Sequence, residues 1–113
     1  MPERVSPSEL AGRPDLAGWR VEGEALAATF DAGSFGAAGA FVAEIARAAD
    51  EAGHHPDVDL RYPGLVHVVT TTHRFTEAPG VVSSGLTTAD VALAATITSL
   101  AAGRGISTAG PGG

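Results

Sequence analysis

Two adjacent histidines provide the strongest indication of chemistry in this chain. His54 and His55 follow Gly53 and precede Pro56. An imidazole titrates close to neutral pH, which suits it to giving and taking protons within one turnover. A single histidine after a helix often only satisfies the terminal carbonyl groups and the negative end of the helix dipole. Adjacent side chains diverge and cannot both do so, and the sequence alone leaves a capping role and a functional role open.

A third histidine, His73, ends a predicted strand and is the best candidate to complete the site. His67 lies on the same predicted strand, roughly 20 Å away along an extended chain. If His73 belongs to the site, His67 therefore does not. Two acids, Asp50 and Asp90, could orient the imidazole rings, and Asp90 is also suited to capping a helix. The sequence thus predicts a site of three histidines and two acids.

A metal site is the main chemical alternative for these histidines. His54, His55, His73 and Asp57 could supply four ligands. Adjacent histidines chelate poorly, since His-x-His or a four-residue helical spacing is what brings two rings to one ion. The absence of cysteine excludes thiolate ligands, thiol nucleophiles and disulfides, and agrees with a reducing compartment. We therefore expect acid/base chemistry without a metal.

The composition limits the classes of partner. The 113 residues are enough for one domain. Seven arginines and no lysine stand against thirteen acids, which gives a net charge of -6 without a basic cluster. This balance argues against nucleic-acid binding. The N-terminal stretch lacks the apolar run of a signal peptide, and no segment has the length of a membrane span. We expect a cytoplasmic protein that binds small molecules or other copies of itself.

The clearest predicted element is a helix that ends just before the histidine pair. Its apolar residues recur at the three- and four-residue spacing of an amphipathic helix. They are Phe35, Ala38, Phe41, Val42, Ile45 and Ala49. Ser34 is suited to the N-cap and Gly53 to a left-handed C-terminal position.

Alternating apolar residues predict four strands, at about 19–22, 26–30, 58–62 and 66–73. In the last of these, Val66 and Val68 lie on one side, and His67, Val69, Thr71 and His73 on the other. The following segment, 74–85, contains a proline, two glycines and two serines, and predicts a long loop.

A second long helix is predicted from Thr88 to Ala102. Thr87 is suited to the N-cap, and Asp90 stands at the third helical position, close to a capping box. Near the N-terminus, a short helix at Ser6–Leu10 is compatible with Ser6 as cap and Pro7 at the first helical position.

The order hairpin, helix, hairpin, helix predicts an α+β fold. We expect a four-stranded antiparallel sheet with two long helices, and the short N-terminal one, packed on one face. The chain then divides into an arm at 1–18, one domain at 19–102 and a flexible, glycine-rich tail at 103–113.

These residues, taken together, resemble the signature of the pterin-4a-carbinolamine dehydratases. The matching positions are Asp50, His54-His55-Pro56, Tyr62, Thr72-His73, Gly85-Leu86-Thr87 and Asp90, with Trp19, Phe30, Phe35, Ala38 and Phe41 upstream. The resemblance covers residues 16–102 and implies the α+β layout predicted above. Two departures stand out: one extra residue between Tyr62 and Thr72, and a longer segment after His73.

The resemblance implies a lyase that dehydrates 4a-hydroxytetrahydropterin, the 4a-carbinolamine, to quinonoid dihydropterin in tetrahydrobiopterin recycling. No metal or organic cofactor takes part in that reaction. His54 and His73 would transfer the protons, His55 would bind the pterin, and Asp50 and Asp90 would belong to the substrate site.

The resemblance also implies assembly as a homodimer or homotetramer. Members of the family include a transcriptional coactivator and assembly factors, so a non-catalytic binding or assembly role is the alternative function. Fold alone does not separate an enzyme from a scaffold. The presence of all three histidines favours the enzyme.

Overall fold

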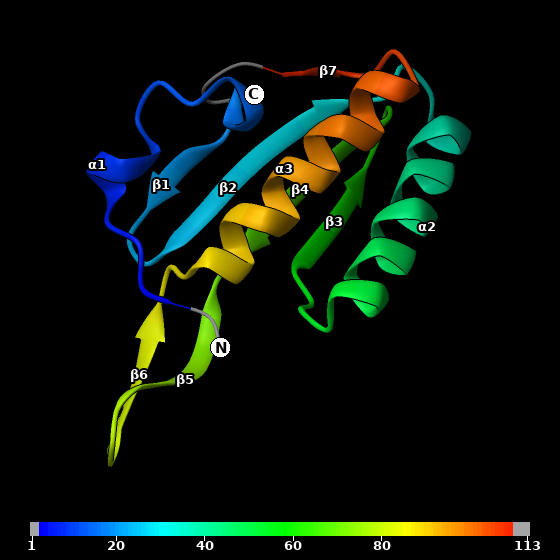
Figure 1. Cartoon of the computed structure of the whole chain (residues 1–113). Helices are drawn as coiled ribbons and strands as arrows, with labels where there is room; N and C mark the ends of the chain where they lie inside the picture. Colours follow the sequence, from blue (N-terminus) through cyan, green and yellow to red (C-terminus); the bar gives the residue numbers. More distant parts are fainter. Residues whose placement is uncertain (1–2, 110–113) are drawn as a thin grey trace.

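The fold is an antiparallel sheet with helices on one face, given by a computed structural model that describes residues 3–109 (Figure 1). The helical elements are α1 (Pro7–Leu10), the 3-10 turn η1 (Pro14–Leu16), α2 (Phe35–Ala52) and α3 (Thr88–Gly103). The strands are β1 (Arg20–Glu22), β2 (Ala25–Asp31), β3 (Asp57–Arg61), β4 (Leu65–Thr70), β5 (Thr72–Ala78), β6 (Val81–Gly85) and β7 (Ser107–Thr108). The α+β prediction is confirmed.

The main sheet has the strand order β1-β2-β4-β3, and all its pairs are antiparallel. The short strand β7 adds a fifth member at the edge of β2, where Ser107 pairs with Asp31 and Thr108 with Phe30. Residues 107–108 of the tail that was expected to be flexible thus form part of the sheet. Ile106 packs against the core and brings the residues after it to the sheet. Residues 110–113 lie outside the described part of the chain.

Helix α2 has the predicted bounds and caps. The Ser34 hydroxyl accepts a hydrogen bond from the backbone N–H of Ala37 at 3.1 Å. Gly53 ends the helix with a φ of 65°, a conformation that glycine adopts without steric cost. The turn is closed by the backbone N–H of His54, which donates to the carbonyl of Ala49 at 3.1 Å. The helix end thus fixes where His54 leaves the backbone.

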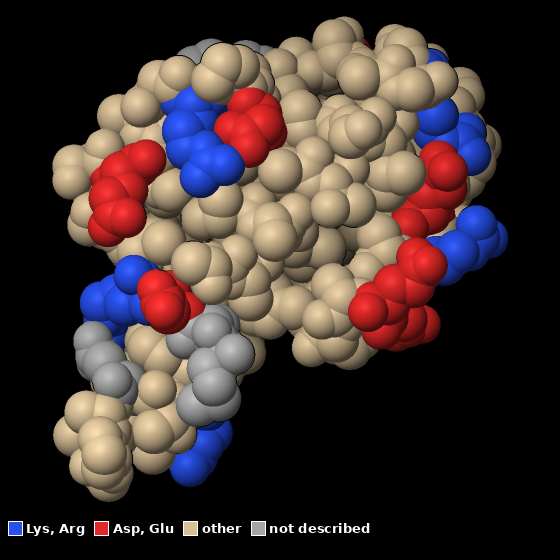
Figure 2. Space-filling model, viewed as in Figure 1, with Lys and Arg blue, Asp and Glu red and all other residues tan. Residues whose placement is uncertain are grey.

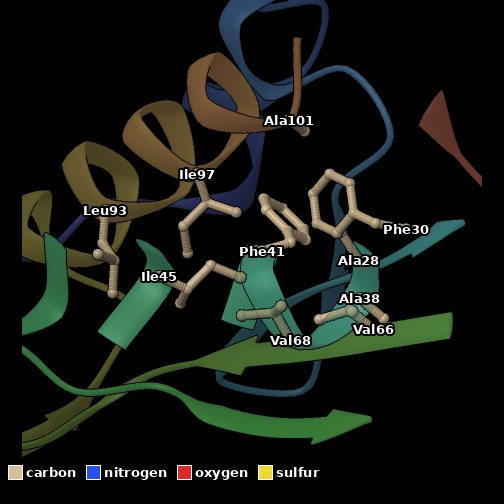
Figure 3. Packing of buried hydrophobic residues seen from close by; sticks show 10 residues of the cluster. All are labelled: Ala28, Phe30, Ala38, Phe41, Ile45, Val66, Val68, Leu93, Ile97 and Ala101. Carbon is tan, nitrogen blue, oxygen red and sulfur yellow. The ribbon is translucent and has the colours of Figure 1, made fainter. Parts of the chain in front are cut away.

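The core lies between the sheet and the helices α2 and α3 (Figure 3). Phe30 of β2 and Phe41 of α2 meet edge to face, with ring centroids 5.3 Å apart. Trp19 packs on Phe30 from the other side, and its indole N–H donates to the Thr98 hydroxyl at 2.9 Å. Valines of β4 and the apolar face of α3 complete this cluster. Its buried members are Ala28, Phe30, Ala38, Phe41, Ile45, Val66, Val68, Leu93, Ile97 and Ala101.

The segment 74–85 is not the predicted loop but most of a hairpin, formed by β5 and β6, that projects from the body (Figures 1 and 2). The glycines and serines suggested a loop, yet only the Pro79-Gly80 pair forms the turn, with φ of 78° at Gly80. Phe75 anchors the base, where the Arg4 guanidinium lies 5.4 Å from its ring centroid. Val81 and Val82, beyond the turn, are exposed.

The predicted strand at 66–73 is divided in two. Strand β4 ends at Thr70, and β5 begins at Thr72 with a different partner. The predicted alternation nevertheless holds, since Val66, Val68 and Thr70 are buried. Thr72 is buried as well, so the buried face continues across the break.

Gly64 lies where the turn between β3 and β4 touches the start of α2. A Cβ atom there would lie 2.6 Å from the carbonyl oxygen of Ser34 and 2.7 Å from its carbonyl carbon. Because this neighbour is backbone, Gly64→Ala is expected to lower the free energy of unfolding by about 1–3 kcal/mol. Urea denaturation measures the change. Gly39→Ala, inside α2 with an ordinary contact at 4.0 Å, is the control and should raise stability by about 0.5–1 kcal/mol. Equal free energies of unfolding for Gly64→Ala and Gly39→Ala would contradict the close packing at Gly64.

Candidate active site

His54 joins the end of α2 to the beginning of α3. Its Nε2 lies 2.6 Å from Oδ1 of Asp90, which stands in the first turn of α3. The His54 side chain is 16% exposed and that of Asp90 is fully buried. The Nε2 side of the His54 ring is therefore held inside the protein.

The Asp90 carboxylate is the centre of a buried hydrogen-bond cluster. The Thr70 hydroxyl donates to Oδ1 at 2.6 Å. The Thr72 hydroxyl and the backbone N–H of Thr87 donate to Oδ2 at 2.8 and 3.0 Å. Hydrogen bonds to an ionised group are stronger than those between neutral groups, so this cluster joins the sheet firmly to the N-terminus of α3.

His55 forms a second acid–imidazole pair, directed to the surface. Its Nε2 lies 2.9 Å from Oδ1 of Asp50, which stands in the last turn of α2. The side chains are 64% and 78% exposed. An exposed pair of this kind contributes no more than about 1 kcal/mol to stability. The two predicted acids thus contact different histidines, Asp90 the half-buried one and Asp50 the exposed one.

His73 lies at the base of the projecting hairpin. Its side chain is exposed, while the preceding Thr72 points inward to Asp90. Among the described residues, no hydrogen bond joins His73 to the other predicted site residues. The structure thus couples His54 directly to Asp90 and leaves the ring of His73 unengaged by protein groups within residues 3–109.

His67 lies away from these residues, on the face of the sheet opposite to the core. Its Nδ1 is 2.8 Å from the Thr29 hydroxyl. Together with Arg61 and Leu65, these two residues line a hollow of about 240 Å³. A larger cavity, of about 560 Å³, lies under the N-terminal arm beside Leu10, Leu16 and Trp19, and none of the predicted site residues lines it.

The four-ligand metal arrangement considered above is not formed in residues 3–109. No group of three or more histidine and acidic side chains in that range could hold a metal ion. His54 and His55 are each engaged with a carboxylate on different sides of the chain.

Thr70 and Thr72 are the site residues that the sequence reasoning missed. The signal that could have found them is the period of two that begins at Val66 and Val68, because it places the hydroxyls of residues 70 and 72 on the buried face. A buried hydroxyl needs a hydrogen-bond partner. Asp90, the acid predicted to cap the second long helix, was a candidate for that partner.

Charged side chains of both signs are spread over the face of the protein shown in Figure 2. In the view of Figure 2, blue and red side chains lie in mixed groups with uncharged surface between them. Within the described part of the chain, no helix is both long and apolar enough to cross a membrane.

The family model "Pterin 4 alpha carbinolamine dehydratase" matches residues 3–100. The chain belongs to this family. A protein of Chloroflexus aurantiacus with the provisional name pterin-4-alpha-carbinolamine dehydratase is 44% identical over 89 residues, which are 79% of this chain and 83% of the relative. A Nocardia farcinica protein with the same provisional name is 38% identical over 100 residues, covering 88% and 96% of the two chains.

A solved structure gives the same assignment. The crystal structure of a transcriptional coactivator/pterin dehydratase from Brucella melitensis superposes with a TM-score of 0.67 at 28% sequence identity. The match covers 88% of this chain and 99% of the Brucella chain. The fold of this pterin dehydratase family member is therefore that of its family, with the β5–β6 hairpin in the position of the longer segment noted in the sequence.

Proposed function

We propose that this pterin dehydratase family member dehydrates 4a-hydroxytetrahydropterin to quinonoid dihydropterin, as part of tetrahydrobiopterin recycling. In this reaction the C4a–O bond breaks and the hydroxyl, once protonated, leaves as water. N5 loses its proton, and its electron pair forms the N5–C4a double bond. The observation that carries the proposal is the half-buried imidazole of His54, held by the buried carboxylate of Asp90 at 2.6 Å.

Two imidazoles supply the proton transfers in this proposal. His54 accepts the N5 proton, because Asp90 stabilises the imidazolium that then forms. His73 delivers a proton to the departing hydroxyl, and its exposed ring is open to a substrate. His55 binds and orients the pterin, supported by Asp50 at 2.9 Å.

The two acids have different roles in the proposal. Asp50 is exposed and contributes to the substrate surface together with His55. Asp90 belongs to the substrate site through His54, since both of its oxygens accept hydrogen bonds from protein groups and its side chain is fully buried.

The decay of synthetic 4a-hydroxytetrahydropterin, followed with and without the purified protein, tests the function directly. We expect the protein to accelerate the decay catalytically, at substoichiometric concentration and with saturation in substrate. General acid–base groups of this kind contribute roughly 100- to 10,000-fold to such a step. A decay rate equal to that in buffer would refute the enzymatic proposal.

A binding or assembly function is the second candidate, and the projecting hairpin favours it. A two-stranded hairpin is marginally stable by itself, and this one exposes Val81 and Val82. The similar Brucella protein is named a transcriptional coactivator as well as a pterin dehydratase. A protein of this kind would bind a protein partner and leave the pterin decay unchanged.

A further inference from the structure

The contacts of Asp90 determine where the proton of His54 lies. A carboxylate accepts hydrogen bonds and donates none. Three of its neighbours donate to it: the hydroxyls of Thr70 and Thr72 and the backbone N–H of Thr87. The fourth neighbour is Nε2 of His54, at 2.6 Å from Oδ1. Since this contact also needs a donor, Nε2 must carry a proton.

The directions of the hydroxyl hydrogen bonds agree with this assignment. The Thr72 hydroxyl gives its one proton to Asp90, so the 2.8 Å contact between the hydroxyls of Thr72 and Thr87 uses the Thr87 proton. The Thr87 oxygen accepts in turn from the backbone N–H of Ala89 at 3.2 Å. Each hydroxyl proton thus serves one hydrogen bond. If the Thr72 hydroxyl donated to Thr87 instead, its contact with the Asp90 carboxylate would have no proton.

We propose that Thr70 and Thr72 are positioning residues that hold Asp90 so that the His54 proton stays on Nε2. Nδ1 is then the atom of His54 that exchanges a proton with the substrate. Within residues 3–109 Nδ1 has no hydrogen-bond partner, and the ring is still 16% exposed. The catalytic meaning of this assignment rests on the proposed function, whereas the proton on Nε2 does not.

The positioning has a chemical consequence for the step at N5. When Nδ1 takes the N5 proton, His54 becomes an imidazolium whose Nε2–H already faces the Asp90 carboxylate. The attraction between these charges is stronger at a buried position than in water. Neither partner has to reorient during the step. An Asp90 side chain free to rotate would lose this advantage.

The first test is the ¹⁵N NMR spectrum of the wild-type imidazoles at a pH where His54 is neutral. Its resonances are assigned from their loss in His54→Gln. We expect His54 to be a single tautomer with a protonated Nε2 and a bare Nδ1. A proton on Nδ1, or an equal mixture of the two tautomers, would overturn the inference, and no substrate is needed to decide it.

The second test compares Thr72→Val with Thr72→Ser. Valine keeps the shape and removes the hydroxyl, whereas serine keeps the hydroxyl. We expect Thr72→Val to mix the His54 tautomers and to lower kcat roughly tenfold at unchanged KM, as outer partners of a catalytic group do. Thr72→Ser should retain the single His54 tautomer and the wild-type kcat. Thr71→Val is the matched control, because the Thr71 hydroxyl donates instead to the backbone carbonyl of Glu24 at 2.6 Å.

A folded Thr72→Val with an unchanged tautomer and kcat would refute the positioning role. If Thr72→Val does not fold, the ¹⁵N spectra of Thr72→Ser and of the wild-type protein still test the inference. A proton on Nδ1 of His54 in either spectrum contradicts it. The proposed function is tested separately. If the wild-type protein does not accelerate the pterin decay but its spectrum shows the Nε2 proton, the proposed function is refuted and the assignment of the proton stands.

Discussion

Replacement of His54 by alanine is expected to lower kcat for 4a-hydroxytetrahydropterin dehydration by roughly 100- to 10,000-fold, the range of a general acid–base group. The imidazole has one nitrogen fixed on Asp90 at 2.6 Å and the other available to the substrate. Alanine removes the proton acceptor and leaves the Asp90 cluster with one partner fewer. Initial rates over a range of substrate concentrations separate kcat from KM. An undiminished rate would exclude His54 from the chemistry.

His67 supplies the control for this experiment. It is also an imidazole bound to a polar side chain, that of Thr29, but on the opposite face of the sheet. His67→Ala should leave kcat unchanged. His73→Ala is the informative companion, since a loss comparable to that in His54→Ala supports two proton-transferring histidines, and an unchanged kcat restricts the transfers to His54.

Replacement of Asp90 by asparagine is expected to affect stability and activity together. The asparagine amide has the size of the carboxylate, but its NH₂ group replaces one of the two accepting oxygens. Since protein groups donate to both Oδ1 and Oδ2 of Asp90, the NH₂ group would face a donor in either orientation. Breaking a buried pair and its hydrogen bonds costs about 3–5 kcal/mol of unfolding free energy. The His54 tautomer is no longer fixed, so kcat should fall by roughly 100-fold or more.

Asp50→Asn is the matched control for Asp90. It makes the same chemical change in the exposed pair with His55, where the stability effect should stay below about 1 kcal/mol. Chemical denaturation gives the two stability changes, and kcat is then measured on the folded variants. Equal stability losses in the two variants would contradict a special role of the buried cluster.

Local signals in the sequence were sufficient for most of the fold. The apolar spacing from Phe35 and the caps Ser34 and Gly53 defined α2, because a helix end depends mainly on its own residues. The β5–β6 hairpin and the short β7 were not predicted. Their pairing depends on partners and anchors elsewhere, such as Arg4 beside Phe75 for the hairpin and β2 for β7.

The candidate site was predictable in its residue types and less so in its contacts. His54 and His55 stood out because the chain has only four histidines and these two follow a predicted helix end. Asp50 and Asp90 stood out because they lie in the last and the first turn of the two long predicted helices. The contact between His54 and Asp90 depends on the packing of α2 against α3, which no local pattern encodes, whereas that between His55 and Asp50 is local to the end of α2. The roles of Thr70 and Thr72 became evident from their hydrogen bonds to Asp90, although the period of two that begins at Val66 already placed both side chains on the buried face.

The base of the β5–β6 hairpin also bears on how the length of this chain can change during evolution. The hairpin leaves the body after Thr72 and returns at Gly85, which pair with each other. The hydroxyls of Thr72 and Thr87 join the two ends at 2.8 Å. Because this closure is independent of what lies between, residues can be inserted or deleted beyond it at small entropic cost. The hairpin is therefore an insertion point at which new sequence can be acquired without displacing Asp90.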